Sequence, residues 1–105
     1  MIDLNVLYKN VMEFSLKLRE KSFDEELYAQ IYQQFQVLFE QWTTQENIPK
    51  SAFVSCLYLV DDLAGGNRFW SDDTCRKAED ALIEMQELIT SIDNHPLSLY
   101  PLKNC

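Results

Sequence analysis

The sequence predicts an all-α fold, in the form of an antiparallel four-helix bundle with an extended C-terminal tail. Apolar residues recur every three or four positions in four separate segments, which is the pattern of helices that bury one face. Short connections join these segments, and an antiparallel bundle is the simplest arrangement that buries four such faces together. The chain has 105 residues with only two glycines and three prolines, so we expect a single helical domain over residues 1–105.

The first two helices are predicted over residues 3–21 and 23–45. The apolar face of the first has Tyr8 beside it and consists of Leu4, Leu7, Val11, Phe14 and Leu18. The second helix is unusually aromatic, and its stripe, flanked by Leu27, Tyr32 and Phe39, consists of Tyr28, Ile31, Phe35, Leu38 and Trp42. Ser22 and Glu25 have the three-residue spacing of a capping box, which makes Ser22 the expected cap of the second helix.

The third helix is predicted over residues 49–64. Asn47 or Ile48 is the expected cap, because Pro49 has no N–H to leave unpaired and is tolerated in a first turn. The apolar run that follows has the composition of a buried strand, but its length and the Gly65-Gly66 stop favour a helix. We expect this helix to be the most buried element, with an inner face of Phe53, Leu57, Val60 and Ala64.

The fourth helix is predicted over residues 72–92, and the tail over residues 93–105. Three adjacent residues offer a cap for the helix: Ser71, Asp72 and Asp73. The apolar stripe of this helix consists of Cys75, Ala78, Leu82, Met85, Ile89 and Ile92. The tail contains two prolines and is expected to be extended, with three residues able to fold back on the bundle: Leu97, Leu99 and Tyr100.

The charge of the chain limits the kinds of partner that it can bind. Seventeen acidic and nine basic residues give a net charge of -8, which repels nucleic acids and anionic lipids and favours basic proteins. Residues 22–47 carry five acidic and no basic residues, and residues 68–105 carry seven acidic and four basic ones. The second and fourth helices are therefore expected to supply most of the acidity.

The N-terminus and the cysteines predict a soluble cytoplasmic protein. Polar residues interrupt the N-terminal sequence before a signal-peptide core forms, and no apolar stretch approaches the roughly 20 residues needed to span a bilayer. Cys56, Cys75 and Cys105 are an odd number without regular spacing, which is untypical of a disulfide scaffold and favours a reducing compartment.

The sequence contains no constellation that predicts catalysis, a metal site or a cofactor. Cys75 lies near a predicted helix start beside Arg76, but its place on the apolar stripe favours packing as a small hydrophobe. The only histidine, His95, has no cysteine or glutamate at the spacing of a zinc or di-iron site. Three carboxylates at helical spacing are interpreted as a solvated outer face rather than an acid–base pair: Asp80, Glu84 and Glu87. We therefore expect a protein that is not an enzyme.

Two features predict a surface that contacts another protein. Asp61 and Asp62 lie at the end of one helix, where the helix dipole does not favour carboxylates, and Asp72 and Asp73 begin the next. We expect all four carboxylates to be exposed and to tolerate reversal to lysine without loss of the fold. The intervening loop carries two large aromatics, Phe69 and Trp70, which fit equally well a binding hot spot and an inward-packed staple.

The predicted partner-binding residues are therefore Asp61, Asp62, Phe69, Trp70, Asp72 and Asp73. The second helix adds an uncharged outer face, for which plain solvent exposure is favoured over a hydrogen-bonding interface: Gln30, Gln33, Gln34, Gln41 and Gln45.

In size, acidity and helical content the chain resembles the bacterial immunity proteins that neutralise nuclease toxins of the colicin and contact-dependent inhibition type. This resemblance is one of general character over the bundle. It implies an antitoxin-like inhibitor that binds a basic toxin domain tightly and blocks its substrate site. Three alternatives remain open: a homodimeric scaffold or adaptor that uses the wide aromatic face of the second helix, a nucleic-acid mimic that depends on carboxylate spacing alone, and an enzyme that acts through Cys75.

Overall fold

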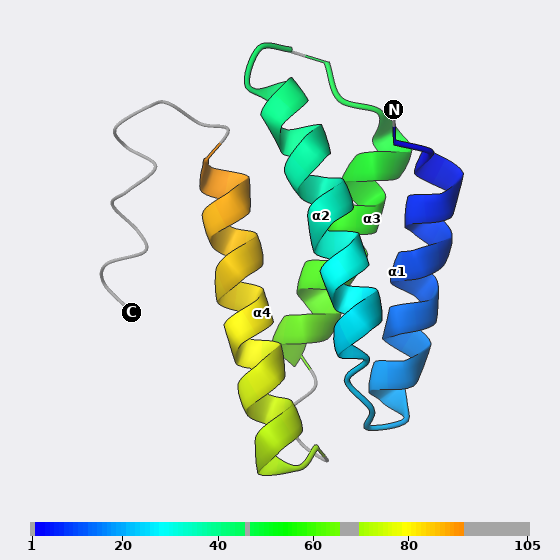
Figure 1. The fold of residues 1–105 in the computed structure, drawn as a ribbon, viewed down its shortest axis with the longest axis vertical. Helices are drawn as coiled ribbons and strands as arrows, with labels where there is room; N and C mark the ends of the chain where they lie inside the picture. Colours follow the sequence, from blue (N-terminus) through cyan, green and yellow to red (C-terminus); the bar gives the residue numbers. More distant parts are fainter. Residues whose placement is uncertain (1, 46, 66–69, 92–105) are drawn as a thin grey trace.

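The computed structural model describes residues 2–45, 47–65 and 70–91, and within these residues the chain forms four α-helices and no strand (Figure 1). The helices are α1 (Leu4–Arg19), α2 (Glu25–Trp42), α3 (Lys50–Gly65) and α4 (Asp72–Thr90). The predicted all-α class is confirmed, and the apolar run that also fitted a strand is part of α3.

The four helices contact one another in a closed cycle. α1 packs against α2 and α3, and α4 packs against the same two helices. In Figure 1, α1 descends, α2 returns upward, α3 passes obliquely behind, and α4 runs upward again. The starts of α2 and α4 therefore lie at the end of the molecule where α1 and α3 finish.

The predicted inner faces of α1 and α2 are confirmed. α2 buries all five residues of its stripe, and α1 buries its stripe except for Leu4, which packs partly against the core. Tyr8 of α1 remains 40% exposed. Aromatic rings join the two helices, since the ring of Phe14 meets that of Phe23 edge-on at 5.2 Å and lies 5.9 Å from that of Tyr28. Aromatic pairs of this geometry add to the stabilisation that comes from burial alone.

The predicted inner face of α3 is wrong except for Val60, which packs partly against the core. Phe53 and Leu57 are 55% and 52% exposed, and the side that α3 turns inward consists instead of Ala52, Ser55, Cys56, Leu59 and Leu63. α3 is apolar on almost every side, so the spacing of its apolar residues does not decide which side faces the core. The buried Ser55 hydroxyl is satisfied within the helix, because it donates to the carbonyl of Ser51 at 2.8 Å. Among the described residues, α2 buries seven side chains and α3 five, so α3 is not the most buried element.

The predicted cap of α2 is also wrong. Asp24 is the N-cap, and its carboxylate accepts a 3.0 Å hydrogen bond from the main-chain N–H of Leu27. Ser22 instead completes the end of α1, because its N–H donates to the carbonyl of Lys17 at 2.9 Å while Lys21 takes a positive φ of 68°. This is the Schellman arrangement, with lysine where glycine is usual.

The predicted cap of α3 is wrong, and the predicted cap of α4 is confirmed. Pro49 precedes the first turn of α3 and accepts a hydrogen bond at its carbonyl from the N–H of Phe53 at 3.2 Å, so neither Asn47 nor Ile48 is the cap. Ser71 caps α4, as one of the three alternatives predicted, and its hydroxyl accepts from the N–H of Thr74 at 3.1 Å.

α4 buries Ala78, Ala81 and Met85, while Leu82 and Ile89 pack partly against the core.

Several predicted features lie outside the described residues, namely Gly66, Phe69, Ile92, His95, Cys105 and the tail over residues 93–105. Among the helices that the structure describes, none has both the length and the apolar character required to cross a lipid bilayer.

Candidate protein-binding surface

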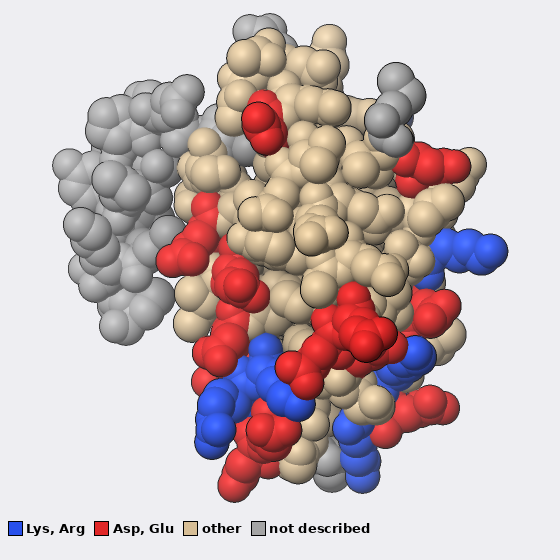
Figure 2. Space-filling view, viewed as in Figure 1, with Lys and Arg blue, Asp and Glu red and all other residues tan. Residues whose placement is uncertain are grey.

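The acidic residues of the chain are concentrated on two helices that touch. α4 carries six carboxylates and two basic residues, and α2 carries three carboxylates and no basic residue. α2 and α4 pack against each other, and Glu25 at the start of α2 lines one groove with Asp80 and Glu84 of α4. Figure 2 shows acidic side chains along α4 and around the start of α2, whereas the upper part of this face is largely uncharged. We call the surface that α4 and the start of α2 form the acidic face.

A groove of about 230 Å³ lies on the acidic face between the first turns of α2 and the middle of α4. Phe23 and Tyr28 supply its aromatic wall, and the charged residues around it are Glu25, Lys77, Asp80 and Glu84. The groove therefore places apolar ring surface beside several carboxylates.

Tyr28 fixes one of these carboxylates. Its hydroxyl oxygen lies 3.0 Å from Oε1 of Glu84 and 3.2 Å from the carbonyl of Ala81. A phenol has one proton to donate, and a carboxylate is the stronger acceptor, so the hydroxyl donates to Glu84. Burial, followed by the negative charge of Glu84, raises the pKa of Tyr28 well above its usual range. Tyr28 thus stays a neutral donor that holds Glu84 at the groove.

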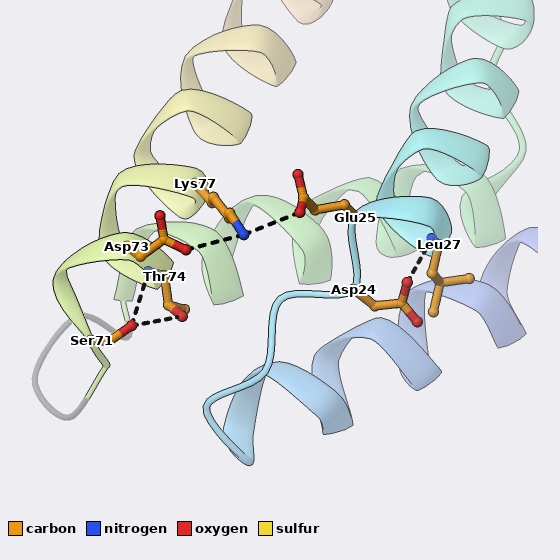
Figure 3. A network of polar contacts seen from close by, with 7 residues as sticks. All are labelled: Asp24, Glu25, Leu27, Ser71, Asp73, Thr74 and Lys77. Carbon is orange, nitrogen blue, oxygen red and sulfur yellow. Dashed lines mark hydrogen bonds and ion pairs between the residues drawn. The ribbon is translucent and has the colours of Figure 1, made fainter.

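A single lysine links the starts of the two acidic helices (Figure 3). Nζ of Lys77 lies 3.1 Å from a carboxylate oxygen of Glu25 on α2 and 3.1 Å from one of Asp73 on α4. The hydrogen bond to Glu25 is the main cause of a raised pKa at Lys77, and the bond to Asp73 adds to it. One cation is therefore accommodated between carboxylates of both helices.

A second lysine joins α1 to the start of α2. Nζ of Lys17 lies 2.6 Å from Oδ2 of Asp24 and 3.7 Å from a carboxylate oxygen of Glu13. The hydrogen bond from Lys17, together with that from the N–H of Leu27, lowers the pKa of Asp24 below its usual value. Basic residues of α1 thus share this end of the molecule with the acidic helix starts, so the end is not uniformly negative.

The four predicted aspartates have three different environments. Asp61 and Asp72 are exposed, and Asp73 pairs with Lys77. Asp62 is half-buried and accepts a hydrogen bond from the buried hydroxyl of Ser15 on α1. The expectation that all four are exposed is therefore wrong for Asp62, because the oblique course of α3 brings this residue against α1. The elements that carry the four residues do meet at one end of the molecule (Figure 1).

Trp70 packs inward, which is one of the two alternatives predicted for it. It is half-buried against the core, and its indole N–H donates to the carbonyl of Leu18 at 3.0 Å. Its predicted partner Phe69 lies outside the described residues.

The cysteines that the structure describes are packed against the protein. Burial raises the pKa of the Cys56 thiol to about 11, so the reactive thiolate is scarce at neutral pH. Cys75 is half-buried, with Sγ 4.0 Å from the carbonyl of Trp70. The described ranges contain no group of three or more histidine, cysteine or acidic side chains arranged to hold a metal ion.

The predicted glutamine face forms part of a second groove. This groove has a volume of about 410 Å³ and lies between α1 and α2, where three glutamines meet the apolar side chains of Ile2, Val6 and Val37: Gln30, Gln33 and Gln34. The amide of Asn10 on α1 donates to Oε1 of Gln34 at 3.3 Å. The sequence predicted the glutamine face of α2. It did not predict that residues of α1 complete a groove beside this face, because that depends on how the two helices pack.

Comparison of the chain with protein-family models, with curated proteins and with solved structures found no match. The function must therefore be argued from the surface itself.

Proposed function

We propose that this protein is a non-enzymatic binding module whose acidic face binds a basic protein domain. The observation that carries the proposal is the groove between α2 and α4, in which carboxylates from both helices surround an aromatic wall. Electrostatic complementarity of this kind accelerates encounter and favours the right partner over others. The exposed Asp61, Asp72 and Asp73 extend the acidic surface toward the end of the molecule where α4 begins.

The chemistry of the groove suits an arginine or lysine side chain of the partner. A guanidinium group makes strong, charge-assisted hydrogen bonds with carboxylates such as Asp80 and Glu84, and it stacks favourably on an aromatic ring such as Phe23. Lys77 supports this assignment, because it already lies between carboxylates of both helices. A partner's cation would meet the same kind of environment.

We propose further that the protein is an immunity or inhibitor protein that neutralises a nuclease toxin. A nuclease binds a polyanion and therefore has a basic substrate site, which an acidic face can cover. The proposal includes an antiparallel four-helix bundle with an extended C-terminal tail as the frame of this surface, and the cytoplasm as its place of action. The general resemblance in size, acidity and helical content supports it.

Charge reversal on and off the acidic face tests the proposal. The first variant carries Asp72→Lys, Asp80→Lys and Glu87→Lys, which are exposed residues of α4. The matched control carries Glu13→Lys, Glu20→Lys and Glu40→Lys, which changes the net charge equally at exposed positions outside the proposed contact. The proposal requires a basic protein domain to be encoded beside this chain's own gene, and both variants are titrated calorimetrically against that domain.

We expect the α4 variant to bind at least tenfold more weakly than the parent, and the control to bind nearly as well as the parent, because among the six substituted residues only those of α4 lie in the proposed contact. Equal weakening of both variants would show that overall charge, and not the acidic face, determines the affinity. No binding by the parent would reject this function. For the immunity assignment, cells that express the toxin domain should survive only with the parent or the control.

A homodimeric scaffold is the second candidate, and the structure changes where its interface must be sought. The aromatic face of α2 is buried, whereas the outer side of α3 exposes four large apolar residues: Phe53, Val54, Leu57 and Tyr58. Such a patch is characteristic of interfaces. Sedimentation at increasing concentration should then show a dimer, which Leu57→Glu abolishes.

Nucleic-acid mimicry stays a third candidate. The exposed Asp80, Glu84 and Glu87 on α4 supply the regular carboxylates that it needs. The mimic would compete with DNA for a basic protein, and substitution of the groove's Phe23 by leucine would leave that competition unchanged.

A further inference from the structure

An apolar groove of about 280 Å³ lies where α2 ends, α3 begins and α4 ends. Its walls come from α2, from α3 and the residues before it, and from α4, and they include Phe39, Trp42, Ile48, Phe53, Leu57 and Ile89. None of the lining side chains is charged. The more than half-exposed Phe53 and Leu57 border it. Soluble proteins usually cover contiguous apolar surface of this kind, so we expect another segment or molecule to bind in the groove.

The chain itself supplies a segment that starts beside this groove. α4 ends at Thr90, directly after the wall residue Ile89. Residues 92–105 follow and lie outside the described residues, and they contain five large apolar residues with one acidic residue and one lysine: Ile92, Leu97, Leu99, Tyr100 and Leu102. An extended chain advances about 3.3 Å per residue, so the six steps from Ser91, the C-cap of α4, to Leu97 span up to about 20 Å. Reach therefore does not limit a return to the groove.

The sequence of this segment fits an elongated apolar groove. Pro96 and Pro101 disfavour a helix, because each lacks an N–H and restricts the residue before it. In an extended chain alternate side chains point the same way, so Leu97 and Leu99 share one side and Ser98 faces the other. Two leucines on one side of the chain are complementary to an uncharged apolar wall.

We propose that Leu97 and Leu99 of the C-terminal segment bind in the apolar groove of the same chain. Covalent attachment gives the segment an effective concentration of the order of mM, which a second copy or a separate protein must match at its own concentration. The groove also lies at the opposite end of α2 and α4 from the acidic helix starts (Figure 1). A basic partner bound at the helix starts would therefore leave the groove uncovered. The inference is thus independent of the proposed function.

A spin label on the segment tests this proposal in the full-length chain. The label is attached through Ser98→Cys in a background of Cys75→Ser and Cys105→Ser, where Ser98 is chosen because it faces away from the groove in the proposed pose. Cys56 stays in place, because its thiol is buried and its pKa is raised to about 11. We expect the methyl NMR signals of Ile48 and Leu57, two groove residues far from the label in the sequence, to lose at least half their intensity relative to the sample with the reduced label. The methyl signals of Leu16, near the far end of α1, should keep theirs.

Two control samples make every outcome decisive. Substitution of Leu97 and Leu99 by serine in the spin-labelled chain should restore the signals of Ile48 and Leu57, and persistent broadening would overturn the proposed contact. A mixture of isotope-labelled chains without the spin label and spin-labelled chains without isotopes should show no broadening. Broadening in this mixture would show that the segment of another copy occupies the groove. No broadening in any sample would show that the segment does not bind there and that a different partner covers the groove. Either result rejects the proposal.

Discussion

The indole N–H of Trp70 donates a 3.0 Å hydrogen bond to the main-chain carbonyl of Leu18, in the last turn of α1. The same carbonyl accepts from the N–H of Lys21 at 2.9 Å, so two donors share one of the acceptors that a helix end leaves unpaired. The residue that precedes the cap of α4 is in this way attached to the end of α1. The position of Asp72 and Asp73 relative to α1 thus depends on Trp70.

Replacement of Trp70 separates its hydrogen bond from its packing. Trp70→Phe removes the donor and keeps an aromatic ring, and Leu18 still accepts from Lys21, so we expect a loss of only about 1 kcal/mol in the free energy of unfolding. Trp70→Ala also removes the packing against the core, and we expect a loss of roughly 2 kcal/mol or more. Urea unfolding followed by circular dichroism measures both. A Phe variant as unstable as the Ala variant would contradict the small role of the hydrogen bond.

Adjacent aspartates at the end of α3 should respond differently to the same substitution. Asp62→Lys removes the acceptor of the Ser15 hydroxyl, which is 5% exposed, and places a cation against α1. We expect a loss of about 1–3 kcal/mol in the free energy of unfolding. Asp61→Lys is the matched control, because Asp61 is exposed and surface substitutions usually change stability by less than about 0.5 kcal/mol. Equal thermal midpoints for the two variants would show that the Ser15 contact contributes nothing.

The sequence was sufficient for the helices and for the inner faces of α1 and α2, because polar residues alternate there with a well-defined apolar stripe. It was insufficient for α3, where residues such as Phe53 and Leu57 are as apolar as the buried Leu59. Tertiary packing alone decides between two apolar sides of one helix. The outcome matters for function, because the side that faces solvent forms part of the apolar groove.

The candidate site shows the same division between local and long-range information. Acidity on the second and fourth helices follows from counting charges, and the cap at Ser71 follows from local propensity. The contacts of Tyr28 with Glu84 and of Ser15 with Asp62 join residues 56 and 47 positions apart, and no local pattern predicts such pairs. The capping box at Ser22 failed for a local reason, since the end of α1 uses the N–H of that residue first.

The lysine in the left-handed region offers a stabilising substitution. Lys21 has φ of 68°, and a residue with a Cβ pays about 1–2 kcal/mol there that glycine avoids. Glycine also loses more entropy on folding, so we expect Lys21→Gly to raise the free energy of unfolding by a net of about 0.5–1 kcal/mol. Lys21→Ala is the control, because it changes the charge equally but retains the Cβ. A gain in thermal midpoint for alanine as large as that for glycine would attribute the effect to the charge.

The pH dependence of stability should reveal the role of Asp24, whose pKa is lowered chiefly by the hydrogen bond from Lys17 and next by that from the N–H of Leu27. A carboxylate with a lowered pKa stabilises the fold above its ordinary value of 3.8, and this contribution is lost as the pH falls through its folded pKa. Asp24→Asn keeps the cap and removes the charge, so it should be less stable than the parent at pH 7, with a difference that closes below pH 3.8. Asp24→Ala also removes the cap and should cost about 1 kcal/mol at pH 7. Denaturant titrations across this range measure the difference. A gap between parent and asparagine variant that stayed constant from pH 7 to pH 2 would show that the Lys17 contact does not act through the charge of Asp24.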